Sequence, residues 1–575
     1  MKKLIAFLLI GAIPIAGIII SYLHHSEYGV DDAYITYRYA LNLVNGHGLN
    51  FNTDGTRVEG YSNLLYVLMM AVGLLIVPPA SIYYFSLCLN AVFLTVCAYV
   101  FYWFAQRETG ERWACAAAFL FCLFTPLWYS AVLGMETPLV LLAQLGIWTT
   151  VTYVARREQS TSRFVFWLCV SSVASVLVRI DGFLMPAAAA LYLILRGRYR
   201  PALLLAGLVA LVVAVHFSFR YHYYGYWLPN TFYVKVDGPL FERVTSGIRS
   251  FFLIVLMADN YLVFALSIAA ALVISMRRVI KERVALFEAV SFGGFFALLW
   301  QGYWVYIGGD WMGSRFMTIL CPIGILSLLQ LLDKYPRATF LGVTGACIFS
   351  FSHHYYTVVT FFKRPDLAHE YCFRVIVVLA VSSAVLYGAS RAKILPGQKS
   401  ILGALAAVVA LTCSIPASFA SAPFGEPKRD MWYELGHFLG KEYPHKTIAV
   451  DAAGKIPYFS GLHAIDMLGL NDTHIAHTRV ENFVAGHSKH DAEYVLKQSP
   501  DIITCWIDTQ LNMSYGLTRS RYIEGGYEVS YVLTDLPDKP IMLDVQNEPA
   551  DKIKSLIGYG GYRYAVLTKG ELRLR

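Results

Sequence analysis

The feature that most constrains the fold of this chain is a series of long apolar stretches across its first 420 residues. Segments such as 202–219 and 401–419 contain no Asp, Glu, Lys or Arg, and each is long enough to cross ~30 Å of hydrocarbon as a helix. Hydrophobic residues make up 57% of the 575 residues and charged residues only 15%. A chain of soluble domains is therefore excluded for most of the length, and the sequence predicts an α-helical polytopic membrane protein.

The apolar stretches predict about 13 transmembrane helices. The first is longer than the ~7–15 residues of a signal-peptide core, so we expect it to be retained as a span. The apolar segment 61–78 is instead interpreted as a helix that lies on the outer membrane surface. The predicted spans are 4–23, 81–104, 113–130, 136–154, 164–178, 183–195, 201–219, 250–276, 284–305, 316–332, 339–360, 375–390 and 400–420.

The distribution of basic residues supports this topology. With the amino terminus inside, the inner segments carry 19 Lys and Arg residues, whereas the much longer outer loops carry 11. Positive charge is enriched in cytoplasmic loops of membrane proteins. If 61–78 crossed the membrane, every later loop would change sides and the bias would be reversed. The net charge of +8 is explained in this way and does not indicate a nucleic-acid partner.

The composition changes near residue 421, where charged residues, Gly and Pro become more frequent. We therefore expect a transmembrane domain over 1–420, with a first outer loop at 24–80, and a soluble α/β domain over 421–575 on the outer, periplasmic face. Acidic residues follow two strand-like runs at Asp451 and Asp466, where open α/β sheets often bind ligands and where turn chemistry is an equal alternative. The expected strands are Thr447–Val450, Ile502–Trp506, Pro540–Val545 and Tyr564–Leu567, and Asp491–Gln498 is expected to be helical.

Two adjacent acidic residues, Asp31 and Asp32, follow the first span. On a helix over 31–45, Asp31 shares one stripe with Arg38 and Asn42, while Asp32 points about 100° away. One interpretation is a helix cap in an ordinary interfacial helix. The functional interpretation makes Asp31 a general base, with Asp32 as its helper or as a metal ligand. Because Arg38 shares the stripe of Asp31, Asp31 is the preferred base.

Further charged and polar residues lie at the outer ends of the predicted spans, where ionisable groups are costly and usually functional. Arg179, Lys235 and Arg315 suit a phosphate held at the membrane surface. The alternative is that these cations pair with Asp181 or Asp310 for structural reasons. The residues predicted to contact the donor phosphate are Arg38, Arg179, Lys235 and Arg315, and those predicted to contact substrate are Glu59, Asn63, Glu136, Asp181, Asn230, Asp310 and Trp311.

The first outer loop resembles that of the GT-C glycosyltransferases. The residues that carry the resemblance are Asp31-Asp32-Ala33-Tyr34-Ile35-Thr36-Tyr37-Arg38-Tyr39-Ala40, Gly46-His47-Gly48-Leu49-Asn50-Phe51-Asn52 and Val58-Glu59-Gly60-Tyr61-Ser62-Asn63. Leu228-Pro229-Asn230-Thr231, Gly308-Gly309-Asp310-Trp311-Met312 and Asp466–Asp472 are similar to the same family. The resemblance extends over nearly the whole chain and is greatest to the bacterial branch that contains the mycobacterial terminal arabinofuranosyltransferase.

The resemblance implies a polyprenyl-phosphate-linked sugar as donor, an acidic base in the first outer loop, surface helices and an extracytoplasmic active site. Asp31 and Asp32 carry over as the acidic pair, and the motif does not decide which of them is the base. The expected activity is inverting transfer of a hexose or pentose, such as arabinofuranose, to a cell-envelope glycan or a protein. The expected location is a bacterial inner membrane.

Lipopolysaccharide is among the envelope glycans that could serve as acceptor. We expect no required cofactor, although a divalent cation at Asp31 and Asp32 would be compatible with the chemistry. The alternative function is a flippase or transporter of polyprenol-linked glycans. A transporter is expected to carry charges deep within its spans and often to contain repeated halves, whereas this chain keeps its charges at the helix ends and shows no internal repeat.

Overall fold

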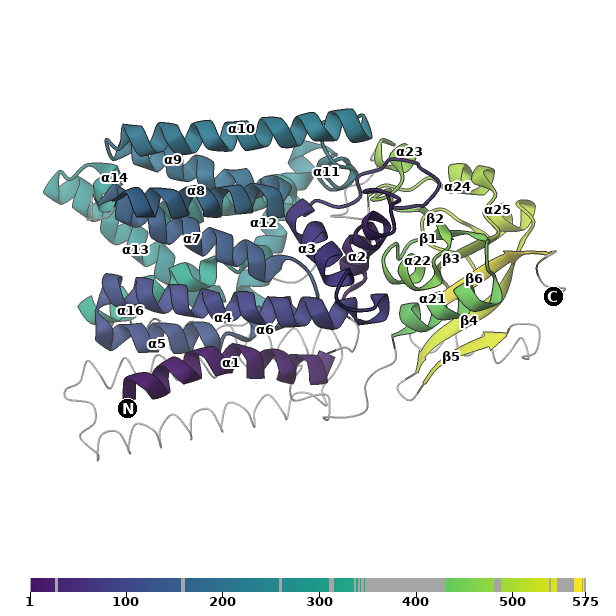
Figure 1. Ribbon diagram of the computed structural model, residues 1–575, viewed down its shortest axis with the longest axis horizontal. Coiled ribbons are helices and arrows are strands. Elements are labelled where there is room, and N and C mark those ends of the chain that lie inside the picture. The colour runs from purple at the N-terminus through teal and green to yellow at the C-terminus, as the bar shows by residue number, and fades with distance from the viewer. Residues whose placement is uncertain are drawn as a thin grey trace.

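The structure is a computed structural model in which an elongated helical bundle is followed by a C-terminal α/β domain (Figure 1). It describes residues 2–25, 29–156, 161–257, 261–309, 315–335, 430–479, 488–536, 539–544 and 563–570, with a few isolated positions beside these ranges. The amino terminus lies at the end of the bundle that is remote from the C-terminal domain, and the carboxyl terminus lies at the far side of that domain.

The helices of the bundle run along the long axis of the molecule, as expected for helices that cross a membrane together (Figure 1). Their apolar composition leaves packing against one another, or against lipid, as the only way to bury their side chains. They are α1 (Lys2–His25), α4 (Ile82–Thr109), α5 (Glu111–Cys122), α6 (Thr125–Val132), α7 (Thr137–Ala155), α8 (Thr161–Val178), α9 (Leu184–Leu195), α10 (Tyr199–Tyr224), α12 (Leu240–Met257), α13 (Tyr261–Glu282), α14 (Leu286–Ala289), α15 (Phe292–Ile307) and α16 (Leu320–Lys334).

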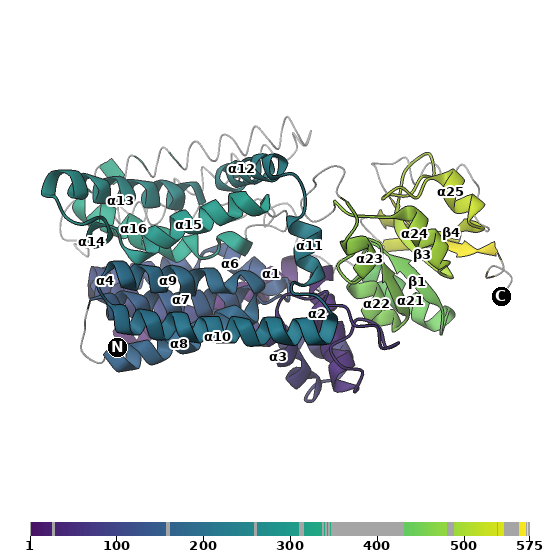
Figure 2. The same cartoon turned by 90° about the horizontal axis from the view of Figure 1, so that it is seen from above.

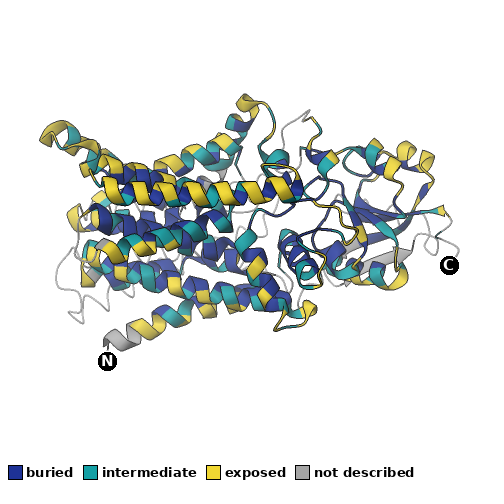
Figure 3. Ribbon diagram, turned by 45° about the horizontal axis from the view of Figure 1, so that its top comes forward, coloured by how far each residue is buried: buried dark blue, intermediate teal, exposed yellow. Residues whose placement is uncertain are grey.

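Within the described residues, four helices are long and apolar enough to cross a membrane, and a fifth span is added if the bent pair α5 and α6 counts as one. In α7, 78% of the most apolar stretch is buried, against 22% in α10, so α7 is central and α10 presents its side chains outward (Figure 3). The expected number of 13 spans is not confirmed. Several predicted spans correspond to shorter apolar helices, and those at 339–360, 375–390 and 400–420 lie outside the described residues.

Three short helices lie at the end of the bundle that faces the C-terminal domain (Figure 2). They are α2 (Asp31–Val44), α3 (Leu64–Leu74) and α11 (Asn230–Val236), and together we call them the connecting layer. At 1.5 Å per residue, the 11 residues of α3 span only about 16 Å. This length is well short of a membrane crossing, and α3 lies beside α2 at one end of the bundle in both views.

The C-terminal domain is built on a six-stranded mixed sheet with the order β2-β1-β3-β6-β4-β5. The strands β1 and β2 are parallel, as are β1 and β3, and the remaining pairs are antiparallel. The strands are β1 (Thr447–Val450), β2 (His463–Asp466), β3 (Ile502–Ile507), β4 (Tyr527–Leu536), β5 (Lys539–Asp544) and β6 (Arg563–Lys569), and the helices are α21 (Met431–Glu442), α22 (Lys455–Ser460), α23 (Thr473–Ala476), α24 (Ala492–Gln498) and α25 (Arg519–Glu524). The predicted α/β character of this region is confirmed.

Candidate active site

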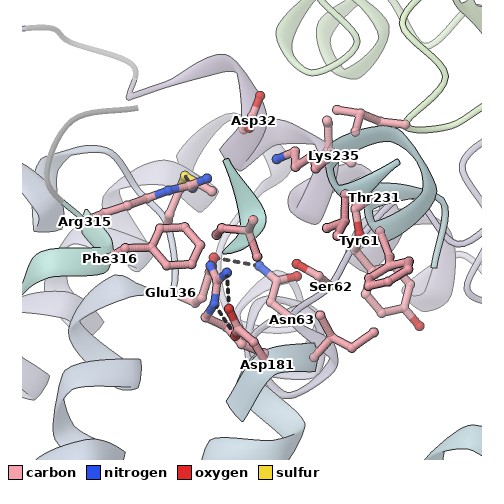
Figure 4. Close-up of a pocket in the computed structure, with 18 of the residues that line it drawn as sticks. Asp32, Tyr61, Ser62, Asn63, Glu136, Asp181, Thr231, Lys235, Arg315 and Phe316 are labelled. Atoms are coloured by element: carbon pink, nitrogen blue, oxygen red, sulfur yellow. Dashed lines mark hydrogen bonds and ion pairs between the residues drawn. The ribbon is translucent and has the colours of Figure 1, made fainter. Parts of the chain in front are cut away.

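A central cavity lies where the ends of α7, α8 and α15 meet the connecting layer (Figure 4). It holds about 1040 Å³ of space that atoms do not fill, counting the solvent at its mouth. Six charged side chains from five segments of the chain line it: Asp32, Glu136, Arg179, Asp181, Lys235 and Arg315.

An ion-pair network forms the floor of the central cavity. The Arg179 guanidinium donates to both carboxylate oxygens of Asp181, at 2.9 and 3.0 Å, and to Glu136 Oε1 at 3.3 Å. Asn63 Nδ2 donates to the other Glu136 oxygen at 2.9 Å, and Tyr303 Oη donates to Asp181 at 3.1 Å. Burial acts to lower the pKa of Arg179, but Asp181 and Glu136 outweigh it and raise that pKa above its ordinary value. Arg179 therefore remains a fixed cation.

Lys235 and Arg315 reach toward the middle of the cavity from opposite sides, with Asp32 at its rim (Figure 4). Arg315 is buried and its Nη1 lies 3.2 Å from the Met135 sulfur. Lys235 is half-buried in the short helix α11. Asp32, on the first turn of α2, is also half-buried. The cavity thus combines a carboxylate that solvent can reach with two cations on separate elements.

The neighbouring residue Asp31 faces the C-terminal domain and is not among the residues that line the cavity. Its carboxylate accepts hydrogen bonds from the backbone N–H groups of Gly454, at 2.9 Å, and Lys455, at 2.7 Å. The Lys455 ammonium in turn donates to Gly29 O at 2.7 Å and pairs with Asp430. Burial raises the pKa of Asp31 to about 7, although the backbone donors act to lower it. We call these contacts the Asp31 clasp.

Arg38 also faces the C-terminal domain, because it lies seven residues, about two turns, after Asp31 on the same stripe of α2. Its guanidinium donates to the backbone oxygens of Phe51, at 2.7 Å, Leu462, at 2.8 Å, and Pro457. Burial lowers the pKa of Arg38 to about 10. The predicted stripe therefore exists, but it anchors the C-terminal domain. The expectation that Arg38 contacts the donor phosphate is not supported by its position.

Two residues predicted to contact substrate form structural contacts outside the cavity. Glu59 accepts from Arg220 Nε at 2.9 and 3.0 Å, and both side chains are almost fully buried. Asn230 is buried at the start of α11, where its backbone N–H donates to Glu59 O at 3.0 Å. Through these contacts, Glu59 binds the first outer loop to Arg220 of α10 and to the start of α11. Neither Glu59 nor Asn230 points into the cavity as the sequence prediction required.

The remaining predicted residues divide into those in the cavity and those outside the described structure. Asn63, Glu136, Asp181, Arg179, Lys235 and Arg315 line the cavity, whereas Asp310 and Trp311 lie outside the described residues. Sequence reasoning missed Tyr303, which reaches Asp181 from α15; its position five residues before Gly308-Gly309 was the available signal. Within the described ranges, no three His, Cys, Asp or Glu side chains are grouped so as to hold a metal ion.

Comparison with known proteins supports a fold class. Residues 426–553 match a family described as a domain of unknown function (DUF8728), and a comparison with curated protein sequences finds no match. The fold is similar to ArnT from Cupriavidus metallidurans in the apo state, with a TM-score of 0.57, 14% identity, and coverage of 88% of this chain and 94% of that one. For ArnT bound to undecaprenyl phosphate, the TM-score is 0.56 at 13% identity, covering 87% and 92%.

A more distant likeness is to the oligosaccharyltransferase AglB from Archaeoglobus fulgidus in complex with an inhibitory peptide and a dolichol-phosphate, with a TM-score of 0.46 and 12% identity over 94% of this chain and 75% of that one. The architecture seen here, a membrane bundle, a connecting layer and a C-terminal α/β domain, is similar to GT-C folds. The chain is thus a multi-pass membrane protein with a GT-C-like fold.

Proposed function

We propose that the protein is a GT-C glycosyltransferase that moves a sugar from a polyprenyl-phosphate donor to an acceptor hydroxyl. One observation carries the proposal: the central cavity brings a half-buried carboxylate, Asp32, together with Lys235 and Arg315 at the junction of the bundle and the connecting layer. Similarity to the ArnT fold, which has been seen with undecaprenyl phosphate bound, supports a lipid-phosphate donor.

In the proposed reaction, Asp32 accepts the proton of the acceptor hydroxyl. The acceptor oxygen then forms a bond to the anomeric carbon of the donor while the bond from that carbon to the phosphate oxygen breaks. One displacement inverts the anomeric configuration. We assign the base to Asp32 rather than to Asp31, because both oxygens of Asp31 already accept backbone hydrogen bonds in the Asp31 clasp.

The leaving group is the polyprenyl phosphate, whose negative charge increases as the bond breaks. Lys235 and Arg315 are proposed to stabilise it, since cations held in place beside the position where charge develops favour the transition state. Arg179 is committed to Glu136 and Asp181 and is proposed to shape the floor of the cavity. A divalent cation beside Asp32 would be compatible with this scheme, and a chelator added to the assay tests whether one is needed.

The sugar and the acceptor remain proposals that follow from the sequence resemblance alone. Arabinofuranose on a polyprenyl phosphate is the first donor to test, followed by hexose donors. The proposed acceptors are envelope glycans, including lipopolysaccharide, and envelope proteins. We propose that transfer takes place on the outer face of a bacterial inner membrane, the face that carries the C-terminal domain.

The test is a transfer assay with the purified full-length protein, a panel of polyprenyl-phosphate sugars and an envelope extract as acceptor. Asp32→Asn should lower turnover roughly 10²–10⁴-fold, the usual cost of losing a general base, and should still bind undecaprenyl phosphate. Asp54→Asn is the matched control, because Asp54 is an exposed acid of the same outer loop. Near-normal turnover by Asp32→Asn would refute the assignment. Movement of intact lipid-linked glycan across vesicles, without sugar transfer by the wild type, would favour the flippase.

A further inference from the structure

A second cavity lies between α4, α7 and α8, at the end of the bundle away from the central cavity. The helix directions establish this placement. Helix α7 begins directly after Glu136 and α8 ends directly before Arg179, and both of these residues line the central cavity. Tyr153, in the second cavity, lies 17 residues beyond Glu136 along α7, which is about 25 Å. We call this the opposite-end cavity.

The opposite-end cavity is basic at its mouth and aromatic along its walls. Arg107 and Arg163 are its charged side chains, and none of its described lining residues is acidic. The Arg107 guanidinium lies over the Tyr153 ring, 4.8 Å from the centroid, and 6.0 Å from the Phe164 centroid. These ring contacts hold a cation in a defined position.

The rim of the opposite-end cavity is built for a membrane–water interface. Trp103 is 55% exposed and Trp167 is 49% exposed, on the last turns of α4 and the first turns of α8. Tryptophan is enriched where bilayer hydrocarbon meets the headgroups. Deeper in the cavity, Thr149 and Thr150 are buried and donate to the backbone of their own helix, so the wall below the arginines presents mainly methyl groups and rings.

We propose that the opposite-end cavity binds an anionic glycerophospholipid. The lipid phosphate would lie between Arg107 and Arg163, and an acyl chain would lie along the rings of Phe104, Phe164 and the two tryptophans. Charge complementarity and the apolar wall together favour a lipid over a free anion, since a free anion would not use the rings. Basic pockets between transmembrane helices are suited to such headgroups. The proposal does not depend on the proposed transferase activity.

The test uses the full-length protein in vesicles with equal amounts of phosphatidylglycerol and phosphatidylethanolamine. After mild extraction, mass spectrometry measures the lipids that remain bound. The wild type should retain phosphatidylglycerol preferentially, and Arg107→Gln/Arg163→Gln should weaken that retention at least roughly tenfold. Arg107→Lys/Arg163→Lys should keep most of it. Arg200→Gln/Arg277→Gln is the matched control, because it removes two exposed arginines of α10 and α13 that do not line the cavity.

A second measurement uses only the wild-type protein, so its result does not depend on whether the variants fold. Phosphatidylglycerol with a photoreactive acyl chain should label wild-type peptides that contain α4 or α8 residues of the opposite-end cavity. The proposal is overturned if the Gln variant retains as much phosphatidylglycerol as the control, or if phosphatidylethanolamine is retained equally. It is also overturned if glycerol phosphate displaces the lipid, which would indicate a simple anion site, or if the label falls only on other helices.

Discussion

At the scale of single residues, Asp31 and Asp32 stand side by side at the start of α2 and face different neighbours. Asp32 lines the central cavity, while Asp31 accepts two backbone hydrogen bonds from the C-terminal domain. Because the two residues are about 100° apart on a helix, one turn of α2 can both present a carboxylate to substrate and fasten the domain above it. In the proposed reaction, Asp32 is the base and Asp31 positions it by binding the C-terminal domain.

The Asp31 clasp requires a glycine at position 454. A Cβ added there would lie 1.8 Å from the Asp31 backbone oxygen, so Gly454→Ala must move α22 away from α2. We expect a loss of about 1–3 kcal/mol in attachment of the C-terminal domain, the range for overpacking. Limited proteolysis measures this loss, because a more weakly attached C-terminal domain is released from the bundle faster. Gly207→Ala, where an added Cβ meets no atom within 4 Å, is the control, and equal release rates in both variants would contradict the prediction.

The two cations of the central cavity provide a second prediction at this scale. Lys235→Ala and Arg315→Ala should each weaken binding of undecaprenyl phosphate roughly tenfold or more, because a hydrogen bond to a charged group contributes about 1.5–3 kcal/mol. Arg57→Ala removes an exposed cation that stacks on Tyr223 outside the cavity and should have little effect. Unchanged affinity in both cavity variants would make these residues structural only.

Local patterns predicted the helix that contains the acidic pair, but they could not reveal its partners. The expected helix over 31–45 is close to the observed α2 (Asp31–Val44), and the expected stripe of Asp31 and Arg38 exists. The stripe faces a surface formed by residues 454–462. Contacts at such separation leave no local signal, so the sequence could not show that the stripe of Asp31 and Arg38 contacts the C-terminal domain.

At the scale of elements, buried carboxyl groups make the stability of the C-terminal domain and of its contact with α2 depend on pH. One of these groups is in α2 and two are in the C-terminal domain. Burial raises the pKa of Asp31 to about 7 and those of Asp451 and Asp466 to about 6, although hydrogen bonds act against each shift. A folded-state pKa above the unfolded value gives a contribution to stability that is present at low pH and lost as pH rises through the folded pKa.

The expected result is a rise in the unfolding temperature of the C-terminal domain as the pH falls from about 8 to about 5. Tryptophan fluorescence can follow the transition, because Trp432 and Trp506 lie in this domain near Tyr564. Asp31→Asn does not titrate, so this variant should show a smaller rise between pH 8 and pH 6. A domain that is less stable at pH 5 than at pH 8 would contradict the prediction.

The strands of the C-terminal domain show which elements a local pattern can predict. The runs at Thr447–Val450 and Ile502–Trp506 match β1 and β3 closely because both strands are buried and rich in β-branched residues. The strand β4 (Tyr527–Leu536) was not predicted. It mixes Glu528, Ser530 and Thr534 with apolar residues, so its strand character depends on antiparallel pairing with β5, which follows it directly, and with β6, which lies further along the chain.

At the scale of the whole molecule, the charge asymmetry predicts which side of the membrane carries the C-terminal domain. With 19 basic residues in the inner segments and 11 in the outer loops, the positive-inside rule places this domain outside. A reporter that works only in the cytoplasm should be silent when fused after Arg575 and active when fused at the amino terminus. Activity at the carboxyl terminus would invert the proposed topology.

The Asp31 clasp also has a consequence for biosynthesis. Gly454 and Asp31 are separated by 423 positions, and at 5–20 residues per second the ribosome needs roughly 20–85 s to extend the chain from one to the other. During that interval the clasp cannot form, because its backbone donors have not yet been made. Leu470, in the same domain, also lines the central cavity, so the cavity is complete only after the C-terminal domain has been synthesised.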